Sequence, residues 1–426
     1  MKRNLLVYSL FLFLLVPPLA AQEDVVVVDD EECGCELVFV DGIQTTQDGD
    51  FFGFKRADGT VIVDNIYKFV DKFHGNYCKV YRDYGQCGLI NRDGHEVVEP
   101  RFADVSYPTE GYILVRDTDG YYGFFDTLGR QRIPFSWRAA STFSQGLAVV
   151  AVDIDSTLVQ YGYIDTDGMM AIAPQFQYAF PFSEGYAVIE SYDRYGMIDL
   201  KGNEVIPPKY EALSGMVQGL FFGGSPDGLA LFGSDLTPIT PFIYDGVVDI
   251  SENRVLVVRQ GLYGFLDRRG REVIPCRYEQ AYLFREGRAA VSLDGRWGII
   301  DTLGREVLPI QYDNSGTRAE LYIYHEGRAL IEKDGRYGFC DLSGDIVIPV
   351  QYRDAYQFSN GLAPVKIDLW GYIDTTGMPF IVPVFDYASP FEYGRAEVIY
   401  MGVIHKMDSR GRCVKNCKNA PKSWKQ

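Results

Sequence analysis

A glycine recurs along this chain at a nearly constant interval, and in most cases an aromatic residue precedes it. The interval averages about 35 residues, and a fixed period between about 20 and 50 residues is the signature of a repeat architecture. Eleven occurrences make a chance alignment implausible. The glycines are Gly53, Gly88, Gly123, Gly162, Gly196, Gly228, Gly264, Gly298, Gly338, Gly371 and Gly402.

The stretch Tyr337–Lys366 shows the repeated unit clearly. An aromatic-glycine pair opens a short apolar strand, and Asp341 then starts a turn that Gly344 closes. Aspartate can accept backbone N–H bonds and glycine tolerates positive φ, so the next strand should fold back as a hairpin. We expect that strand to end at Pro349, because proline interrupts pairing. A connecting segment with aromatic residues follows, and then a third strand, Gly361–Lys366.

The fold class follows from this unit. Three short strands cannot bury both faces of a sheet, so neighbouring units should stack and share a continuous core. The sequence therefore predicts an all-β tandem array of about eleven three-stranded meanders, with aromatic side chains between the units. We favour an open, superhelical stack. A propeller-like ring is the alternative, although common propellers have about four to eight blades of four strands.

The repeats are unequal, which bears on how the array is divided. The first repeat lacks the aspartate, and the repeats at Gly228 and Gly402 lack the aromatic residue as well. Worn terminal repeats are typical of capped arrays. A glycine-rich stretch precedes Gly228, so we expect either a seam between two sub-arrays or an exposed loop near 211–227. The repeat domain is predicted to span 36–413.

The two ends of the chain have different compositions. Residues 1–21 have the charged, apolar and small-residue layout of a secretory signal peptide, and the apolar run is too short to span a membrane. Residues 22–35 are predicted to be an acidic tether, and 414–426 a solvated basic tail. We therefore expect an exported protein that is periplasmic, displayed on the surface or secreted, with no membrane span.

The net charge is −17, and this excludes some partners. A strongly acidic surface disfavours nucleic acid and anionic lipid. Its simplest role is solubility outside the cytoplasm.

Export makes disulfides possible for the eight cysteines. Cys78 and Cys87 flank a turn, and we predict a bridge between them across a hairpin. Cys276 and Cys340 stand at apolar repeat positions and are predicted to be packed thiols. Zinc is a weaker alternative, because the cysteine pairs lack nearby histidines at finger-like spacing.

Four further cysteines lie at the ends of the repeat domain. Cys33 and Cys35 precede the first repeat, and Cys413 and Cys417 close the last one. Bridges from the first pair to the second would require the two ends to meet, and their connectivity stays open.

Seven aspartates recur at the turn position, and their periodicity predicts one structural task done repeatedly. Two local patterns, such as Asp165-Thr166-Asp167-Gly168, faintly resemble calcium loops but lack the bidentate glutamate. The histidines are scattered and form no triad arrangement, and the glycines form no phosphate loop. The aspartates are Asp126, Asp165, Asp199, Asp267, Asp301, Asp341 and Asp374.

Taken together, the motifs resemble the bacterial WG-repeat family. Trp297-Gly298 and Trp370-Gly371 keep the literal dipeptide, and tyrosine replaces the tryptophan in five other repeats. The resemblance covers nearly the whole chain after residue 36. It implies an all-β repeat protein, often exported, with binding or scaffold roles, and it supplies no catalytic residue to transfer.

The function predicted from this pattern is an exported, non-enzymatic scaffold for protein–protein interaction in the cell envelope, without cofactor or metal. A glycan-binding repeat protein is the first alternative, which would show exposed Tyr or Trp in a row at repeat spacing. A hydrolase on a propeller-like fold is the second, and it would need two or three non-repeating acids or histidines converging in one cleft. Protein and glycan both stay open as partner.

Overall fold

The structure is a computed structural model that describes residues 25–30, 35–40, 42–56, 58–154, 159–315, 318, 321–392, 394–415, 417, 420–421 and 424. The predicted signal peptide, 1–21, lies outside these residues. The chain divides into two compact units. We call Phe39–Ile243 the 39–243 unit. The 244–426 unit contains Tyr244–Gln426 together with the described residues before Phe39.

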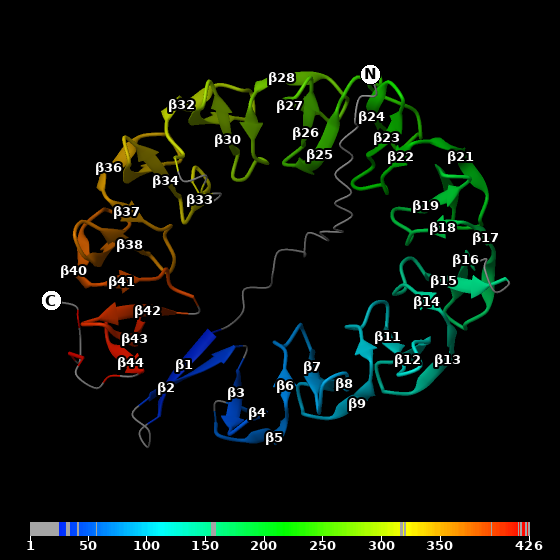
Figure 1. The fold of residues 1–426 in the computed structure, drawn as a ribbon, viewed down its shortest axis with the longest axis horizontal. Helices are drawn as coiled ribbons and strands as arrows, with labels where there is room; N and C mark the ends of the chain where they lie inside the picture. Colours follow the sequence, from blue (N-terminus) through cyan, green and yellow to red (C-terminus); the bar gives the residue numbers. More distant parts are fainter. Residues whose placement is uncertain are drawn as a thin grey trace. The chain divides into compact units, whose positions relative to one another are not determined.

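Every regular element of the described residues is a β-strand, and the strands form eleven antiparallel sheets. Each sheet is built from strands that follow one another in the sequence, as Figure 1 shows by the gradual change of colour. The all-β tandem-repeat fold predicted from the sequence is therefore confirmed.

Within each sheet we number the strands in chain order, and most sheets have four. The chain begins with β1 (Val25–Asp30) and β2 (Cys35–Val40). First strands are β6 (Phe69–Val70), β10 (Asp104–Val105), β14 (Ala139–Ala140), β18 (Tyr178–Ala179), β22 (Ala212–Leu213), β25 (Gly246–Ser251), β29 (Gln280–Ala281), β33 (Tyr324–His325), β37 (Asp354–Ala355) and β41 (Tyr387–Ala388). Second strands are β3 (Ile43–Asp48), β7 (Tyr77–Tyr81), β11 (Tyr112–Arg116), β15 (Leu147–Asp153), β19 (Tyr186–Ser191), β23 (Phe221–Ser225), β26 (Arg254–Arg259), β30 (Arg288–Leu293), β34 (Arg328–Lys333), β38 (Leu362–Lys366) and β42 (Arg395–Tyr400). Third strands are β4 (Phe51–Arg56), β8 (Cys87–Asn91), β12 (Tyr122–Asp126), β16 (Val159–Asp165), β20 (Arg194–Asp199), β24 (Gly228–Phe232), β27 (Leu262–Asp267), β31 (Arg296–Asp301), β35 (Arg336–Asp341), β39 (Trp370–Asp374) and β43 (Val403–Asp408). Fourth strands are β5 (Val61–Tyr67), β9 (Glu96–Phe102), β13 (Gln131–Trp137), β17 (Met170–Phe176), β21 (Glu204–Tyr210), β28 (Glu272–Tyr278), β32 (Glu306–Tyr312), β36 (Ile346–Tyr352), β40 (Pro379–Phe385) and β44 (Cys413–Lys415).

The four-stranded sheets differ from the predicted three-stranded meanders because the connecting segment contributes a short strand. In β29, for example, Gln280 pairs with Ser292 and Ala281 with Val291 of β30. A strand of two residues has no periodicity that a sequence pattern could reveal.

The proline does not end its strand, contrary to the sequence prediction. In β32 the strand passes through Pro309 and continues to Tyr312, which pairs with Trp297. The next paired residues are Ile299 and Leu308, so three residues of β32 lie opposite the single residue Gly298. Proline is tolerated here because a bulge leaves its nitrogen out of the ladder.

This bulge explains the glycine of the repeat. A Cβ atom on Gly298 would lie 2.7 Å from the carbonyl oxygen of Leu308, and one on Gly338 would lie 2.7 Å from that of Ile348. Real carbon and oxygen atoms do not approach so closely without displacement of the backbone. The glycine is therefore required by the strand that crosses it.

The strand register corrects two of the eleven repeat positions. The residue equivalent to the repeat glycine pairs with the second strand, as Gly196 does with Ile189 and Gly371 does with Val365. In β24 this residue is Ala230, which pairs with Gly223, and in β43 it is His405, which pairs with Val398. Gly402 lies instead in the hairpin turn before β43, and Gly228 is the first residue of β24, directly after a hairpin turn.

Both exceptions occur where the crossing fourth strand is incomplete. The sheet of β22, β23 and β24 has three strands, and the chain beyond β24 bonds to Leu231 through Ile239 and Thr240. In the last sheet β44 is only three residues long, and Trp424 lies against His405 with ring centres 5.9 Å apart. A side chain is accommodated at these two positions because no bulged strand covers them.

The cores lie between consecutive sheets, as the stacking prediction requires. In one repeated pair, the residue after the motif glycine packs on the phenylalanine 19 positions later, with ring centres 4.7 Å apart for Phe265 and Phe284 and 4.8 Å apart for Phe339 and Phe358. All four rings are buried. Each such pair joins a third strand to the segment between the first and second strands of the next sheet.

Three predicted boundaries differ from the structure. Part of the tether predicted over 22–35 is strand β1, whose valine run, Val25–Val28, favours extended backbone. In the predicted solvated tail, 414–426, Val414 and Trp424 are buried, and Trp424 donates its backbone N–H to Gly411 at 2.8 Å. The two units divide between Ile243 and Tyr244, whereas the seam was expected near 211–227.

Candidate binding surfaces

Each of the seven predicted aspartates lies at the end of a third strand and holds the turn that follows. The Oδ1 atom of Asp301 accepts the backbone N–H groups of Leu303 and Arg305, both at 2.9 Å. The same two bonds, at 2.9 to 3.1 Å, form at Asp126, Asp165, Asp199, Asp267, Asp341 and Asp374. The structure thus spreads these residues over seven separate turns and brings no two of them into one cleft.

The same arrangement at Asp408 was missed from the sequence. Its Oδ1 atom accepts the N–H groups of Arg410 and Arg412. The misplaced register of the last repeat hid it, although the spacing of Asp408 to Gly411 was the available signal.

Hydrogen bonds lower the pKa of several of these carboxyl groups. At Asp199 the main cause is the Asn203 side chain, and at Asp374 it is the Thr376 hydroxyl. At Asp301 burial alone would raise the pKa, but the backbone and side chain of Arg305 outweigh it and the net shift is downward. These groups are held in the ionised form that caps a turn, which is the opposite of what a general acid needs.

The turn glycine also contacts the preceding repeat. A Cβ atom on Gly168 would lie 3.1 Å from Ile133, one on Gly304 3.1 Å from Ile274, and one on Gly377 3.1 Å from Ile348. These glycines have positive φ, so conformation and space both require glycine. The aspartate turn is therefore a stacking joint between consecutive sheets.

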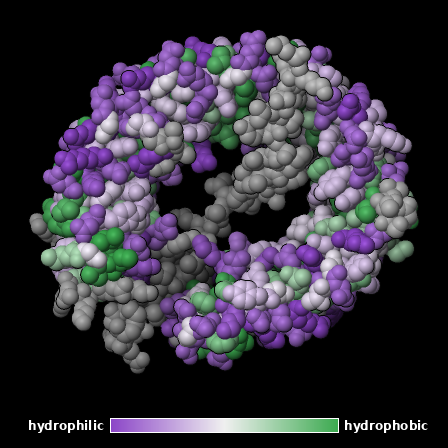
Figure 2. Space-filling view, viewed as in Figure 1, coloured by the Kyte–Doolittle hydropathy of each residue, from purple (hydrophilic) through white to green (hydrophobic). Residues whose placement is uncertain are grey.

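Apolar side chains stand exposed at six of these turns, and we call them the turn row. Their exposed fractions lie between 38% and 72%. Figure 2 shows a mainly hydrophilic face with small hydrophobic areas scattered over it. The turn row consists of Leu128, Met169 and Leu200 in the 39–243 unit, and Leu303, Leu342 and Met378 in the 244–426 unit.

A second turn links consecutive repeats by carboxylates. Glu184 accepts the backbone N–H of Gln218 at 2.5 Å and that of Gly219 at 2.7 Å. Glu110 binds the equivalent groups of Gln145 and Gly146 at 2.7 and 2.9 Å. These acids are committed to holding neighbouring turns together, so they are not free to act on a substrate.

Three tyrosines project from the loops that join second and third strands in the 39–243 unit. Tyr84 is 85% exposed, Tyr121 40% and Tyr192 94%. They belong to β7–β8, β11–β12 and β19–β20, and we call them the hairpin tyrosines. In contrast, Trp297, Trp370 and Trp424 are buried. Sequence alone could not separate these exposed aromatics from the core ones, because both occur at repeat spacing.

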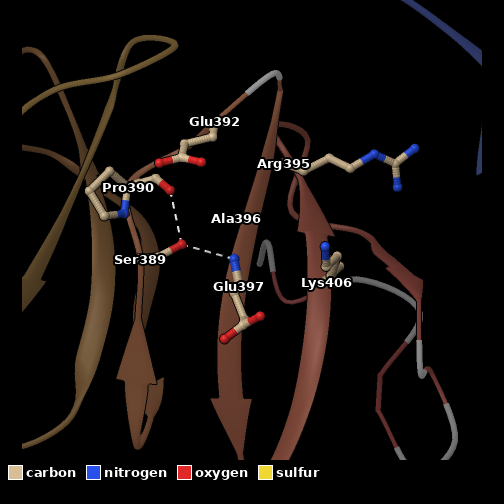
Figure 3. A pocket seen from close by; sticks show the side chains of 7 residues that line it. All are labelled: Ser389, Pro390, Glu392, Arg395, Ala396, Glu397 and Lys406. Atoms are coloured by element: carbon tan, nitrogen blue, oxygen red, sulfur yellow. Dashed lines mark hydrogen bonds between the residues drawn. The ribbon is translucent and has the colours of Figure 1, made fainter. Parts of the chain in front are cut away.

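A polar hollow lies at the last sheet, lined by residues of β42, β43 and the segment before β42 (Figure 3). Ser389 is the one hydroxyl in it, and its oxygen donates to the carbonyl of Pro390 at 2.9 Å and accepts the N–H of Glu397 at 2.9 Å. Ser106, Ser141 and Ser214 make the same two kinds of bond in other repeats. Ser389 is therefore a repeated structural serine, and the hollow lacks an activated nucleophile.

The cysteines correct one prediction. Cys78 and Cys87 are free and buried thiols, so the predicted bridge between them is wrong. In the hairpin Cys78 pairs with Ile90 and Cys87 with Tyr81, and this offset of three residues places the two side chains on opposite faces. Cys340 is buried and Cys276 partly so, both as free thiols. Cys413 forms a disulfide with Cys417, with 5.7 Å between their Cα atoms. Cys33 and the side chain of Cys35 lie outside what the structure describes.

No metal site emerges from the residues that the structure describes, since none of their His, Cys, Asp and Glu form a group of three or more suited to an ion. His405 is buried in β43, and His74, His95 and His325 lie on other strands or loops.

A sequence model of the WG containing repeat matches eight segments of the chain: 88–121, 122–153, 161–193, 195–222, 263–297, 297–337, 337–368 and 370–399. Together they cover more than half of the sequence. The chain belongs to the WG-repeat family. The three WG repeats outside the match are the first, the one with Ala230 and the one with His405, so two of the three lack the motif glycine.

No curated protein matches the chain. Solved structures similar to this WG-repeat protein include a eukaryotic initiation factor, with 12% identity over 72% of this chain and 95% of that one and a TM-score of 0.40. BamB from Moraxella catarrhalis is 12% identical over 64% of this chain and 91% of its own, with a TM-score of 0.31. The extracellular domain of the putative hybrid two component system BT3049 from B. thetaiotaomicron is 9% identical over 94% and 72%, with a TM-score of 0.25.

In the described part of the chain, no helix has the length and apolar character needed to cross a bilayer.

Proposed function

We propose that this WG-repeat protein is an exported, non-enzymatic scaffold that binds a protein partner along the turn row. The observation that carries the proposal is the turn row itself. The aspartate turn needs only its aspartate and its glycine, because those two residues make the hydrogen bonds and the close contact with the preceding repeat. Neither of these interactions uses the side chain of the exposed Leu or Met.

The chemistry of the turn row fits a protein partner with apolar side chains. Leucine and methionine are apolar, and methionine adapts its shape to irregular surfaces. Their recurrence within each unit gives several small contacts instead of one deep pocket. The net charge of −17 argues against nucleic acid or anionic lipid as the partner.

Export is supported by two observations. The first 21 residues have the layout of a signal peptide, and the Cys413–Cys417 disulfide suits an oxidising compartment. Fractionation of the source cells and N-terminal sequencing of the mature protein test this, with Gln22 expected as the first residue. An intact Met1 on protein from the soluble cytoplasm would refute it.

The absence of enzymatic activity is supported by how the acids and Ser389 are used. The seven turn aspartates hold turns, Glu110 and Glu184 hold neighbouring turns, and Ser389 is bonded on both sides. The hydrolase alternative would need reactive groups that converge and are free to act.

The binding proposal is tested by affinity capture from envelope extract, followed by titration with the purified partner. A variant with Leu128→Ser, Met169→Ser and Leu200→Ser should lose the partner. A control with Val61→Ser, Ile66→Ser and Val217→Ser alters similarly exposed apolar residues outside the aspartate turns and should retain it. Equal affinity of both variants for the partner would overturn the turn row as the binding surface.

A further inference from the structure

Tyr192 occupies a backbone conformation that a tyrosine rarely adopts. It has φ 53° and the next residue, Asp193, has φ 57°, so both central residues of this two-residue hairpin turn are left-handed. Such turns favour Asn-Gly and Asp-Gly, because a bulky side chain is strained at positive φ. The equivalent turns Asp294-Gly295 and Asp334-Gly335 of the 244–426 unit follow that preference. An aromatic residue that is strained and almost fully exposed points to a function instead of a folding role.

Tyr84 and Tyr121 also lie in loops between second and third strands, with Tyr84 nearly as exposed as Tyr192 and Tyr121 less so. The ring of Tyr84 lies beside Phe69, itself exposed, with ring centres 5.4 Å apart. The backbone N–H of Tyr121 is fixed by the Asp117 carboxylate at 2.8 Å, and that of Tyr84 by Asp83 at 2.8 Å. The three rings therefore stand in loops between second and third strands of three sheets, and local bonds hold the backbone of two of these loops.

A paired set of polar side chains accompanies each ring. Next to Tyr121, Arg138 binds Asp153 with 2.8 Å between Nε and Oδ2. The Gln177 amide donates to Asp193, the residue after Tyr192, at 3.0 Å. Within the loop that carries Tyr84, Arg82 binds Glu96 at 2.9 Å.

These pairs decide which ligand chemistry the surface suits. Two of the three pairs join a carboxylate to an arginine, Asp153 to Arg138 and Glu96 to Arg82, so these two pairs add no net charge that a cationic peptide could use. Guanidinium, amide and carboxylate groups nevertheless keep further donor and acceptor positions, which can bind hydroxyl groups. A flat aromatic ring beside such groups can cover the apolar face of a sugar ring while the polar groups bind its hydroxyls.

We infer that the hairpin tyrosines form a binding surface for an uncharged glycan chain, in which Tyr84, Tyr121 and Tyr192 stack on sugar rings. The inference is independent of the turn row, since it uses other residues at the loops between second and third strands. The corresponding loops of the 244–426 unit are closed differently and serve as an internal comparison. There an acid binds the turn backbone, as Glu279 does at Gly295 and Asp245 does at Gly261, both at 2.9 Å.

The test uses the full mature chain on an array of neutral, acidic and amino-sugar oligosaccharides, with a Lys- and Arg-rich peptide as a further probe. The wild type should bind neutral oligosaccharides, and the best of these is then titrated by calorimetry. Replacing each hairpin tyrosine by alanine should weaken its binding about tenfold or more, whereas the phenylalanine variants should bind within about threefold of the wild type, since an aromatic anchor is retained. The affinity should change little over an about tenfold range of salt, because no net charge is neutralised.

The control is Met401→Ala, at the exposed turn of β42–β43 in the other unit, which should bind as the wild type does. Circular dichroism checks that the tyrosine variants are folded. Three results would overturn the inference: no neutral glycan bound by the wild type, glycan binding unchanged in the alanine variants, or salt-sensitive binding of the cationic peptide that the alanine variants lose. Capture of the protein partner through the turn row is measured separately, so failure of one proposal is distinguishable from failure of the other.

Discussion

Replacing Gly196 by alanine should destabilise the 39–243 unit, because the new methyl group has no space. Its carbon would lie 2.6 Å from the carbonyl oxygen of Ile206 and 2.8 Å from the nitrogen of Pro208. Both contacts are with backbone of the crossing strand β21, so no side chain can rotate away. The bulge that lets Tyr195 pair with Tyr210 would have to open. Overpacking of this kind costs about 1–3 kcal/mol.

The matched control is Gly215→Ala in the same unit. A Cβ atom there meets nothing within 4 Å, and its φ is not in the left-handed region. Alanine at such a site reduces the freedom of the unfolded chain and should change stability by less than about 1 kcal/mol, in the stabilising direction. The two variants therefore introduce the same chemical change with opposite expected signs.

Urea unfolding followed by circular dichroism measures the effect, and hydrogen exchange assigns it to one unit. For a unit of this size, the expected cost lowers the melting temperature of the 39–243 unit by about 2–12 °C. The exchange rates of the 244–426 unit should be unchanged. If Gly196→Ala were as stable as the wild type, or if Gly215→Ala were equally destabilised, the explanation of the motif glycine by the crossing strand would be wrong.

Three further predictions test other joints of the array. Glu184→Ala removes the carboxylate that binds two N–H groups of the next turn. It should lower the free energy of unfolding by about 1–3 kcal/mol, measured by urea titration. The control Glu204→Ala, at an exposed strand position, should have little effect in the same titration. The Thr376 hydroxyl and the turn N–H groups lower the pKa of Asp374, so its contribution to stability is complete above about pH 4 and is lost as the pH falls through the lowered folded-state pKa. Asp374→Asn should therefore reduce the loss of stability at acidic pH. An unchanged dependence of stability on pH would contradict the role of Asp374 in the turn. Burial raises the pKa of the Cys78 thiol to about 12 and of the Cys340 thiol to about 11. When the native protein is treated with iodoacetamide at pH 8, mass spectrometry should therefore find Cys78 and Cys340 unmodified and Cys276 labelled. It should find no disulfide-linked peptide that contains Cys78 and Cys87.

The sequence predicts the repeat and its hairpin because each depends on residues that the local backbone demands. Asp301 accepts two N–H groups of the turn and Gly304 has the positive φ that the turn requires, so both residues mark the turn in the sequence. The path beyond Pro309 is less predictable. Proline suggests the end of a strand, but a bulge lets the strand continue to Tyr312, and the pairing of Tyr312 with Trp297 depends on a partner 15 residues away.

The candidate surfaces were predictable in kind but not in place. Exposed tyrosines at repeat spacing are the feature that favours a glycan over a protein ligand, yet Tyr192 and the buried Tyr163 cannot be told apart by composition. What separates them is the register of β19 and β20, which puts Tyr192 in the turn. Registers of the worn repeats were misplaced for the same reason, since Gly402 in a hairpin turn and Gly228 directly after one imitate the motif.

The link between the motif glycine and the strand that crosses it has a practical use. When the repeats are aligned by strand pairing, Ala230 and His405 replace the motif glycine in two repeats that lack a full-length fourth strand. The absence of the motif glycine in the sequences of related repeat proteins can therefore identify, without a structure, the repeats whose fourth strand is altered. At such repeats a segment could be inserted, or the array shortened, without a fourth strand having to cross a side chain.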